Sequence, residues 1–284
     1  MNKYYFLKLI FVFFIFSFSS CSHEILSGAL QTTPVKVDAK LNDWEIPLRF
    51  FDNGTKINYS ITNDLQNLYI CMRITDAQIQ TKIIHAGMEV WIDTTGKKKK
   101  NIGISFPIST GEKIKYGDRA TSNTTGLESA DKRDRAKMQA TFLSSNKDMQ
   151  LKGFQPPLNG FMHLNNDSGV NVSMNWDSTN TLIYEAKIAF KTFYKEKLTS
   201  ADSAKFLGIG IVLNGMQVIT PTTRGSAGQG MNPAGGMTGV GGMGSNSRLG
   251  GMGSGASGGG GHGKDYNTFA NPKKIWIRVG LAVK

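Results

Sequence analysis

Apolar and polar residues alternate along several short stretches of the chain, and this period of two is typical of β-strands. Residues 56–62 alternate in this way, and residues 68–74 carry four apolar side chains on one face: Leu68, Ile70, Met72 and Ile74. Turn formers occupy residues 63–66 between them, which predicts an antiparallel hairpin. Similar signals recur at residues 89–93, 101–107, 170–176, 181–190, 205–213 and 274–279. Many short strands with few helices predict an all-β fold, a β-sandwich of two antiparallel sheets.

Two short helices are expected beside these strands. In residues 77–85, Ile79, Ile83 and Ile84 share one face of a helix, and Gly87 is placed to end it. Residues 191–198 are the second candidate.

Two segments interrupt the strand pattern. Residues 117–137 are polar and rich in charge, which predicts an exposed loop or extended insertion. In residues 225–263, 18 of the 39 residues are Gly and none is aromatic or acidic. Such a segment buries too little apolar area to offset its ordering entropy, so we expect a flexible Gly/Met-rich loop. Because a strand signal follows at residues 274–279, the loop is inserted between strands of one domain covering residues 34–284.

The chain opens with a pattern typical of export. Lys3 and Lys8 precede an apolar run at residues 9–16, which predicts a signal peptide over residues 1–20. Small residues then stand directly before Cys21, with Phe18 where Leu is more common. This resembles the lipobox of bacterial lipoproteins, in which the cysteine becomes the lipidated N-terminus. Residues 21–33 would then be a lipidated tether, and the alternative is an ordinary signal peptide with a free Cys21.

Composition limits the cofactors and partners that the chain is expected to bind. The chain of 284 residues has 2 cysteines and 4 histidines, with no spacing typical of a metal site, and we expect no cofactor. Its formal charge of +12 suits lipid headgroups or anionic polymers, and an exported chain seldom meets nucleic acid. The run from Lys97 to Lys100 follows a turn signal, where exposed lysines are common.

Several residues of interest are expected to have structural roles, judged from their neighbours in the sequence. Cys71 lies in a strand-like run and is expected to be a small buried residue. Trp44 is expected in the core, and Asp93 is expected to cap the turn after its strand. Trp91 points away from its neighbours Val90 and Ile92, so it belongs either to a core face or to a binding site.

Four blocks in order carry a resemblance to a known family. Residues 35–44, 63–70, 87–93 and 184–188 resemble the opening and middle of family 9 carbohydrate-binding modules. The resemblance extends from about residue 35 to residue 279 and implies a jelly-roll, immunoglobulin-like sandwich that holds the end of a sugar chain. DOMON-type haem domains have a related sandwich.

The resemblance also implies a sugar site. The family's carboxylate falls on Glu89, and one of its two clamping aromatics falls near Phe269, with Tyr266 and Asn267 close by. The other aromatic position falls near Ile83, which cannot stack on a sugar. Trp91, on the same strand as Glu89, completes the set of candidate carbohydrate-binding residues.

The sequence therefore predicts an exported lipoprotein of the cell envelope, at the outer membrane, whose non-catalytic sandwich binds a glycan. The first alternative is an envelope lipoprotein that binds a protein partner or has a structural role, without a glycan site. A glycoside hydrolase is a second alternative, which would need two paired carboxylates. Its candidates are Asp38, Asp43, Asp64, Asp76, Glu89, Asp93 and Glu185.

A metal or haem domain is a third alternative. Met88 with His85 or His163 would supply haem ligands, as in DOMON-type domains. Thioethers also suit Cu(I), and the Gly/Met-rich loop offers a series of them. Its candidates are Met231, Met237, Met243, Met252 and His262.

Overall fold

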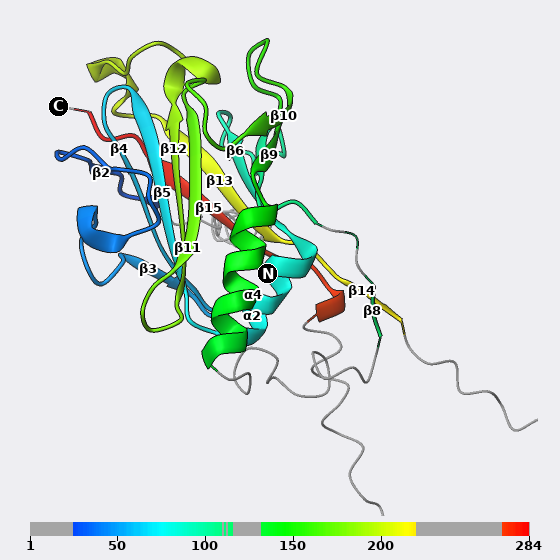
Figure 1. Cartoon of the computed structure of the whole chain (residues 1–284). Coiled ribbons are helices and arrows are strands. Elements are labelled where there is room, and N and C mark those ends of the chain that lie inside the picture. Colours follow the sequence, from blue (N-terminus) through cyan, green and yellow to red (C-terminus); the bar gives the residue numbers. More distant parts are fainter. Residues whose placement is uncertain (1–24, 110, 112, 116–131, 220–268, 284) are drawn as a thin grey trace, which may run out of the picture.

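The computed structural model describes residues 25–109, 111, 113–115, 132–219 and 269–283. Two sheets face each other in this part of the chain, and two helices lie beside their lower end as drawn in Figure 1. The seven-stranded sheet has the order β1 (Ile25–Leu26), β15 (Lys273–Gly280), β13 (Phe206–Leu213), β6 (Met88–Asp93), β7 (Ile102–Ser105), β9 (Asp148–Lys152) and β10 (Gly160–His163). The six-stranded sheet has the order β11 (Val170–Trp176), β12 (Leu182–Ala189), β5 (Asn67–Ile74), β4 (Ile57–Asn63) and β2 (Ala29–Leu30), with β3 (Phe50–Asp52) beside β4.

This arrangement confirms the predicted two-sheet β-sandwich. Neighbouring strands in both sheets are antiparallel, except that β1 pairs with β15 and β2 pairs with β4 in parallel. A third, two-stranded sheet joins β8 (Lys113–Lys115) and β14 (Gln217–Ile219), also in parallel. All eight strands expected from the alternating pattern are present, with bounds that differ from the prediction by one or two residues.

The main core lies between the inner faces of the two sheets. From the six-stranded sheet, Ile70 and Tyr184 are fully buried there, and from the seven-stranded sheet Ile92 and Ile211 are. Alternation along each strand explains this, because every second side chain points inward. The hydroxyl of Tyr184 has no hydrogen-bond partner among the described residues, which makes it an unsatisfied polar group in the middle of the core.

Helix α2 (Ala77–Ala86) confirms the first helix prediction. Asp76 caps its start by accepting a hydrogen bond from the amide of Ile79 at 3.0 Å. Gly87 ends it with a φ of 79°, a conformation that favours glycine. Ile79 and Ile83 are buried in the main core, as their shared face predicts.

A second long helix, α4 (Lys132–Ser145), contradicts part of the polar-insertion prediction. It begins inside residues 117–137 and packs against β11, where the ring of Phe142 meets Trp176 edge-on at 5.6 Å between centroids. The rest of the insertion, residues 117–131, lies outside the described residues, as does the predicted Gly/Met-rich loop at 225–263.

The segment predicted as a tether is partly built into the fold. Within residues 21–33, β1 pairs with the edge of one sheet and β2 with the edge of the other. Gly28 lies between them, so close to Gly280 that a Cβ atom would lie 1.9 Å from its carbonyl oxygen. Only glycine fits at position 28. The segment therefore joins an edge of one sheet to an edge of the other.

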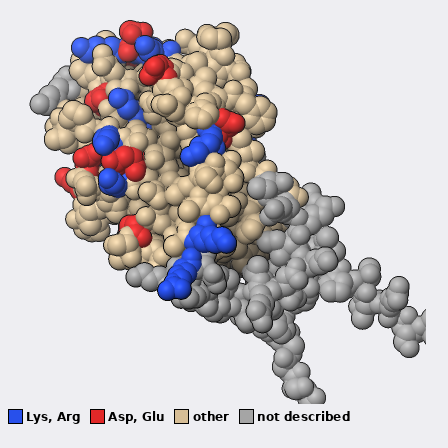
Figure 2. Space-filling model, viewed as in Figure 1, with Lys and Arg blue, Asp and Glu red and all other residues tan. Residues whose placement is uncertain are grey.

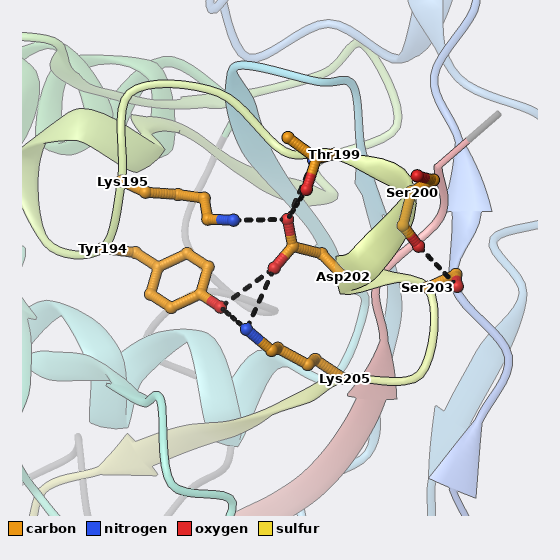
Figure 3. Close-up of polar contacts among 7 residues, drawn as sticks. All are labelled: Tyr194, Lys195, Thr199, Ser200, Asp202, Ser203 and Lys205. Atoms are coloured by element: carbon orange, nitrogen blue, oxygen red, sulfur yellow. Dashed lines mark hydrogen bonds and ion pairs between the residues drawn. The ribbon is translucent and has the colours of Figure 1, made fainter.

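The predicted helix at residues 191–198 is wrong. One 3-10 turn, Phe190–Thr192, overlaps its start, and a second, Ser200–Asp202, follows its end. Figure 3 shows why the second turn is stable, because Lys195, Thr199 and Lys205 all point to the buried carboxylate of Asp202. These hydrogen bonds, with that of Lys195 first, hold the pKa of Asp202 well below its usual range. The carboxylate thus ties three parts of the loop before β13 together.

Residues 35–48 cover part of the outer face of the six-stranded sheet. Val35, Trp44 and Leu48 pack there on Cys71, which confirms that Trp44 and Cys71 are core residues. Burial raises the pKa of the Cys71 thiol. Glu185 on β12 anchors the segment: its carboxylate is buried and accepts hydrogen bonds from the segment's own donors.

Candidate functional site

The outer face of the seven-stranded sheet carries the two candidate residues of β6. Val90 and Ile92 point into the main core, so Glu89 and Trp91 point to the opposite face. Trp91 lies directly across from Gly103 of β7 on one side and Gly210 of β13 on the other. Gly210 in turn lies across from Trp276 of β15. One row across four strands therefore alternates glycine and tryptophan.

The glycines make room for the indole rings. A Cβ atom on Gly103 would lie 2.6, 2.7 and 2.8 Å from three ring atoms of Trp91. A Cβ atom on Gly210 would lie 2.8, 2.9 and 2.9 Å from three ring atoms of Trp276. Near-equal distances to three ring atoms mean that each ring lies face-on over the glycine backbone. The large ring that the sequence placed on this face is accommodated by the neighbouring strands.

Charged groups surround the ring of Trp91. Its indole N–H donates a hydrogen bond to Glu89 Oε2 at 2.7 Å, and the Lys100 ammonium donates to the same oxygen at 2.8 Å. The Lys100 ammonium also lies 5.0 Å from the centre of the Trp91 ring, and that of Lys152 lies 6.0 Å from it. Trp91 is only 6% exposed as a result, although both lysines are exposed residues.

A second row on the same face adds an exposed aromatic side chain. The cross-strand register aligns six residues from β10 to β15: Phe161, Gln150, Ser105, Glu89, Val212 and Lys274. Phe161 is 73% exposed, and neighbouring strands are about 4.8 Å apart, so about 14 Å separates it from Glu89. Trp276 is half-buried. We call this face, defined by Glu89, Trp91, Phe161, Lys152 and Trp276, the Trp face.

The structure brings together only part of the predicted sugar site. Glu89 and Trp91 are in contact, but Phe269 is 3% exposed and packs with Ala86 and Met216. Tyr266 and Asn267 lie outside the described residues. Phe161 was missed because no strand was predicted at residues 160–163, and its alternating neighbours Met162 and Leu164 were the available signal.

A buried lysine holds the turn that contains Phe269. Lys82 of α2 donates hydrogen bonds to the carbonyl oxygens of Phe269 at 2.8 Å and Asn271 at 2.6 Å. Burial, with a smaller contribution from nearby Lys273, lowers the pKa of Lys82 to about 8. Because its polar contacts are backbone carbonyls of the turn before β15, we assign Lys82 a structural role.

Several carboxylates considered for catalysis have structural partners. Asp93 accepts hydrogen bonds from Thr95 and Lys99 in the turn after β6, as predicted. Burial acts to raise its pKa, and these hydrogen bonds outweigh it and lower the pKa. Asp64 accepts a hydrogen bond in the turn between β4 and β5, and Asp76 accepts one at the start of α2. Glu185 accepts hydrogen bonds from the segment of residues 35–48. These contacts give the four carboxylates ordinary structural functions.

Two cavities lie on or beside the six-stranded sheet. The larger, about 380 Å³, is lined by polar groups that include Asn67, Asn171, Lys187 and Glu196, without an aromatic side chain among its described lining. The smaller, about 190 Å³, lies beside Trp44 and Arg49. In Figure 2 basic and acidic residues are interspersed over the visible face, without an extended patch of one sign.

The described ranges contain neither a cluster of metal ligands nor a membrane-spanning helix. There, no cluster of three or more His, Cys, Asp or Glu side chains is arranged to hold a metal ion. Met88, a candidate haem ligand, is fully buried in the main core, and the methionine series of the Gly/Met-rich loop lies outside those ranges. No helix in the described ranges is long and apolar enough to cross a membrane.

Comparisons with known proteins add little to this geometry. No protein-family profile matches the chain, and no curated protein matches its sequence. Among solved structures, it is similar to a family 9 carbohydrate-binding module from Caldicellulosiruptor kristjanssonii in complex with glucose. The identity is 12% over 68% of this chain and 79% of that chain, with a TM-score of 0.31. Values this low do not place the chain in that family.

Proposed function

We propose that the chain is an exported lipoprotein, anchored through lipid on Cys21 at the outer membrane, whose sandwich binds a saccharide without catalysis. The proposed binding surface is the Trp face. The observation that carries the proposal is the pair of adjacent rows on this face, which combine aromatic rings with carboxylate, amide and ammonium groups.

Sugar recognition needs both kinds of group. The C–H surface of a sugar ring packs on an aromatic face, and polar side chains bond its hydroxyls. Phe161 is exposed to solvent and Trp276 is partly exposed, and the strands that carry Glu89 and Gln150 lie between them. Trp91 becomes accessible when the exposed side chains of Lys100 and Lys152 move off its ring. A ligand that lacks hydroxyls leaves such polar groups unpaired, which gives selectivity.

The test is a glycan array followed by calorimetry on the chain from Ser22 onward. Phe161→Ala should weaken saccharide binding by about fivefold, since ring stacking contributes on the order of 1 kcal/mol. Phe51→Ala is the matched control: Phe51 is 53% exposed and lies on β3 of the other sheet. Glu89→Gln should weaken binding as well. Absence of binding to every neutral and acidic glycan would refute the saccharide proposal.

The proposed anchor needs its own test. Cells that express the chain would be fed a labelled fatty acid, and the label should appear on the parent chain and be lost in Cys21→Ser. A label that persists in Cys21→Ser, or that is absent from the parent, would refute lipidation.

A partner-binding lipoprotein without a glycan site is the second candidate. The observation that favours it is the cover that Lys100 and Lys152 give to Trp91, which leaves the exposed Phe161 as an isolated apolar anchor. Cross-linking in the envelope, with a photoreactive group at position 161, would capture such a partner.

A further inference from the structure

The turn between β6 and β7 presents a group of lysines in a fixed conformation. Asp93 accepts hydrogen bonds from Thr95 N at 2.9 Å, Thr95 Oγ1 at 2.7 Å and Lys99 N at 2.9 Å, which closes the turn from within. Gly96 lies against the ring of Phe206, where a Cβ atom would come within 2.2 Å of it. The turn is therefore held from within by Asp93 and on one side by the ring of Phe206.

Three of these lysines are not neutralised. Lys100 pairs with Glu89, whereas Lys97, Lys98 and Lys99 make no ion pair with any residue that the structure describes. The carboxylate of Asp93 is buried and engaged with the turn. Lys97 and Lys99 are exposed, and Lys98 is half-buried. We call Lys97, Lys98 and Lys99 the lysine turn; it is a compact group of basic residues whose ammonium groups form no ion pair with a described residue.

The chain enters the seven-stranded sheet in the same cross-strand row as Asp93, which lies at the base of this turn, with β15 and β13 between them. Ile25 of β1 lies across from Arg278 of β15, and Arg278 Nε donates a hydrogen bond to the carbonyl oxygen of Gly96 at 3.1 Å. Only residues 22–24 separate Ile25 from Cys21. Four residue steps span at most about 14 Å when fully extended. A lipid on Cys21 would therefore keep the row of the sheet that leads to the lysine turn near the membrane that receives the lipid.

We propose that the lysine turn is a second membrane contact, which binds the headgroups of an anionic lipid surface and fixes the orientation of the sandwich on it. This inference rests on the proposed lipid anchor. Two independent observations support it: the three lysines form no ion pair with a described residue, and the turn follows Asp93 in the row at which the chain enters the sheet. Each lysine close to an anionic bilayer strengthens binding by about fivefold, so the three together contribute about 100-fold.

The test uses one acyl chain in place of the natural anchor, because a single chain alone gives only marginal membrane binding and leaves a second contact visible. The mature chain from Cys21 onward would be coupled through that thiol to a single-chain alkyl maleimide. Coupling should be selective, since Cys71 is fully buried and burial raises its pKa. Partition is then measured on vesicles of equal parts phosphatidylglycerol and phosphatidylcholine, and on pure phosphatidylcholine.

The variant K97Q/K98Q/K99Q should partition about 100-fold more weakly on the anionic vesicles, and equally on the neutral ones. The matched control, K36Q/K137Q/K147Q, removes the same charge from three exposed lysines elsewhere and should behave as the parent. The expected difference should also shrink as salt is raised from about 0.01 to 0.1 M.

Equal partition of K97Q/K98Q/K99Q and the parent on anionic vesicles would overturn the proposal. Tight binding to a soluble acidic polysaccharide, with no preference for anionic vesicles, would also overturn it and reassign the turn to that polymer. Both outcomes are separate from failure of the anchor itself, which the fatty-acid labelling of Cys21 decides, and from failure of saccharide binding, which Phe161→Ala decides.

Discussion

Replacing Glu185 by alanine should release the segment that covers the six-stranded sheet. Glu185 Oε2 accepts hydrogen bonds from the amides of Asp38 at 2.9 Å and Ala39 at 2.6 Å, and Oε1 accepts one from Trp44 Nε1 at 2.7 Å. Alanine leaves all three donors without a partner. Ala39 and Trp44 are buried, so water cannot replace the carboxylate while the segment stays closed.

The magnitude follows from the donors left unpaired. A buried donor without a partner costs about 1–3 kcal/mol, so the closed form should lose about 3 kcal/mol once relaxation is allowed. That loss corresponds to an opening equilibrium about 100-fold more favourable. Cys71 lies beneath the segment and is the single cysteine of a chain that begins at Ser22, so its labelling rate reports the opening. Its reaction with a thiol reagent should accelerate about 100-fold.

A conservative variant separates lost hydrogen bonds from lost packing. Glu185→Gln keeps one carbonyl oxygen for the two backbone donors and should accelerate labelling of Cys71 by only about tenfold. Denaturant unfolding on the same samples shows whether opening is local or global. Unchanged labelling in Glu185→Ala, with stability within about 1 kcal/mol of the parent, would refute the role assigned to this carboxylate.

Three further predictions concern the core, a buried lysine and the Trp face. Tyr184→Phe removes a buried hydroxyl that has no partner among the described residues and should stabilise the protein by about 1 kcal/mol in denaturant unfolding; destabilisation would reveal a bond to that hydroxyl. Because burial lowers the pKa of Lys82 to about 8, the unfolded chain binds more protons above that pH. The free energy of unfolding should therefore rise between about pH 8 and about pH 10, by up to about 1.4 kcal/mol per unit, and Lys82→Met should remove the rise. Gly210→Ala should cost about 1–3 kcal/mol by displacing Trp276, whereas Gly280→Ala, whose Cβ would meet atoms at 3.6 and 3.7 Å, should be neutral; equal losses would contradict the face-on packing.

The sequence predicts strands well where apolar and polar residues alternate over several positions. In β4, β5, β11 and β12 the alternation is long enough to stand above chance, and the turn residues between them fix the hairpins. Strands β1 and β2 are two residues each, which is too short for any period to show. Helix α4 was not predicted for a different reason: most of its residues are polar, and Phe142 is its one buried residue among those whose burial is described, so its sequence resembles an exposed loop.

The Trp face could be predicted only within one strand. Spacing by two residues places Glu89 and Trp91 on the same face, and it also sets Trp276 apart from its neighbours Ile275 and Ile277. Which glycines lie beneath the rings depends on strand order and register, which a single sequence does not reveal. Phe161 joins the face through β9 and β10, and Phe269 is excluded by the turn that Lys82 holds.

The pairing of β1 with one sheet and of β2 with the other has a consequence for how the protein folds. In the seven-stranded sheet, β15 lies between β1 and β13, so the last strand along the chain is inserted beside the first. During synthesis from the N-terminus, β13 remains an open sheet edge until residues 273–280 follow, and open edges recruit strands from other chains. The yield of folded protein should therefore depend on how quickly the C-terminal residues follow, whether the chain emerges from a ribosome or from an export channel.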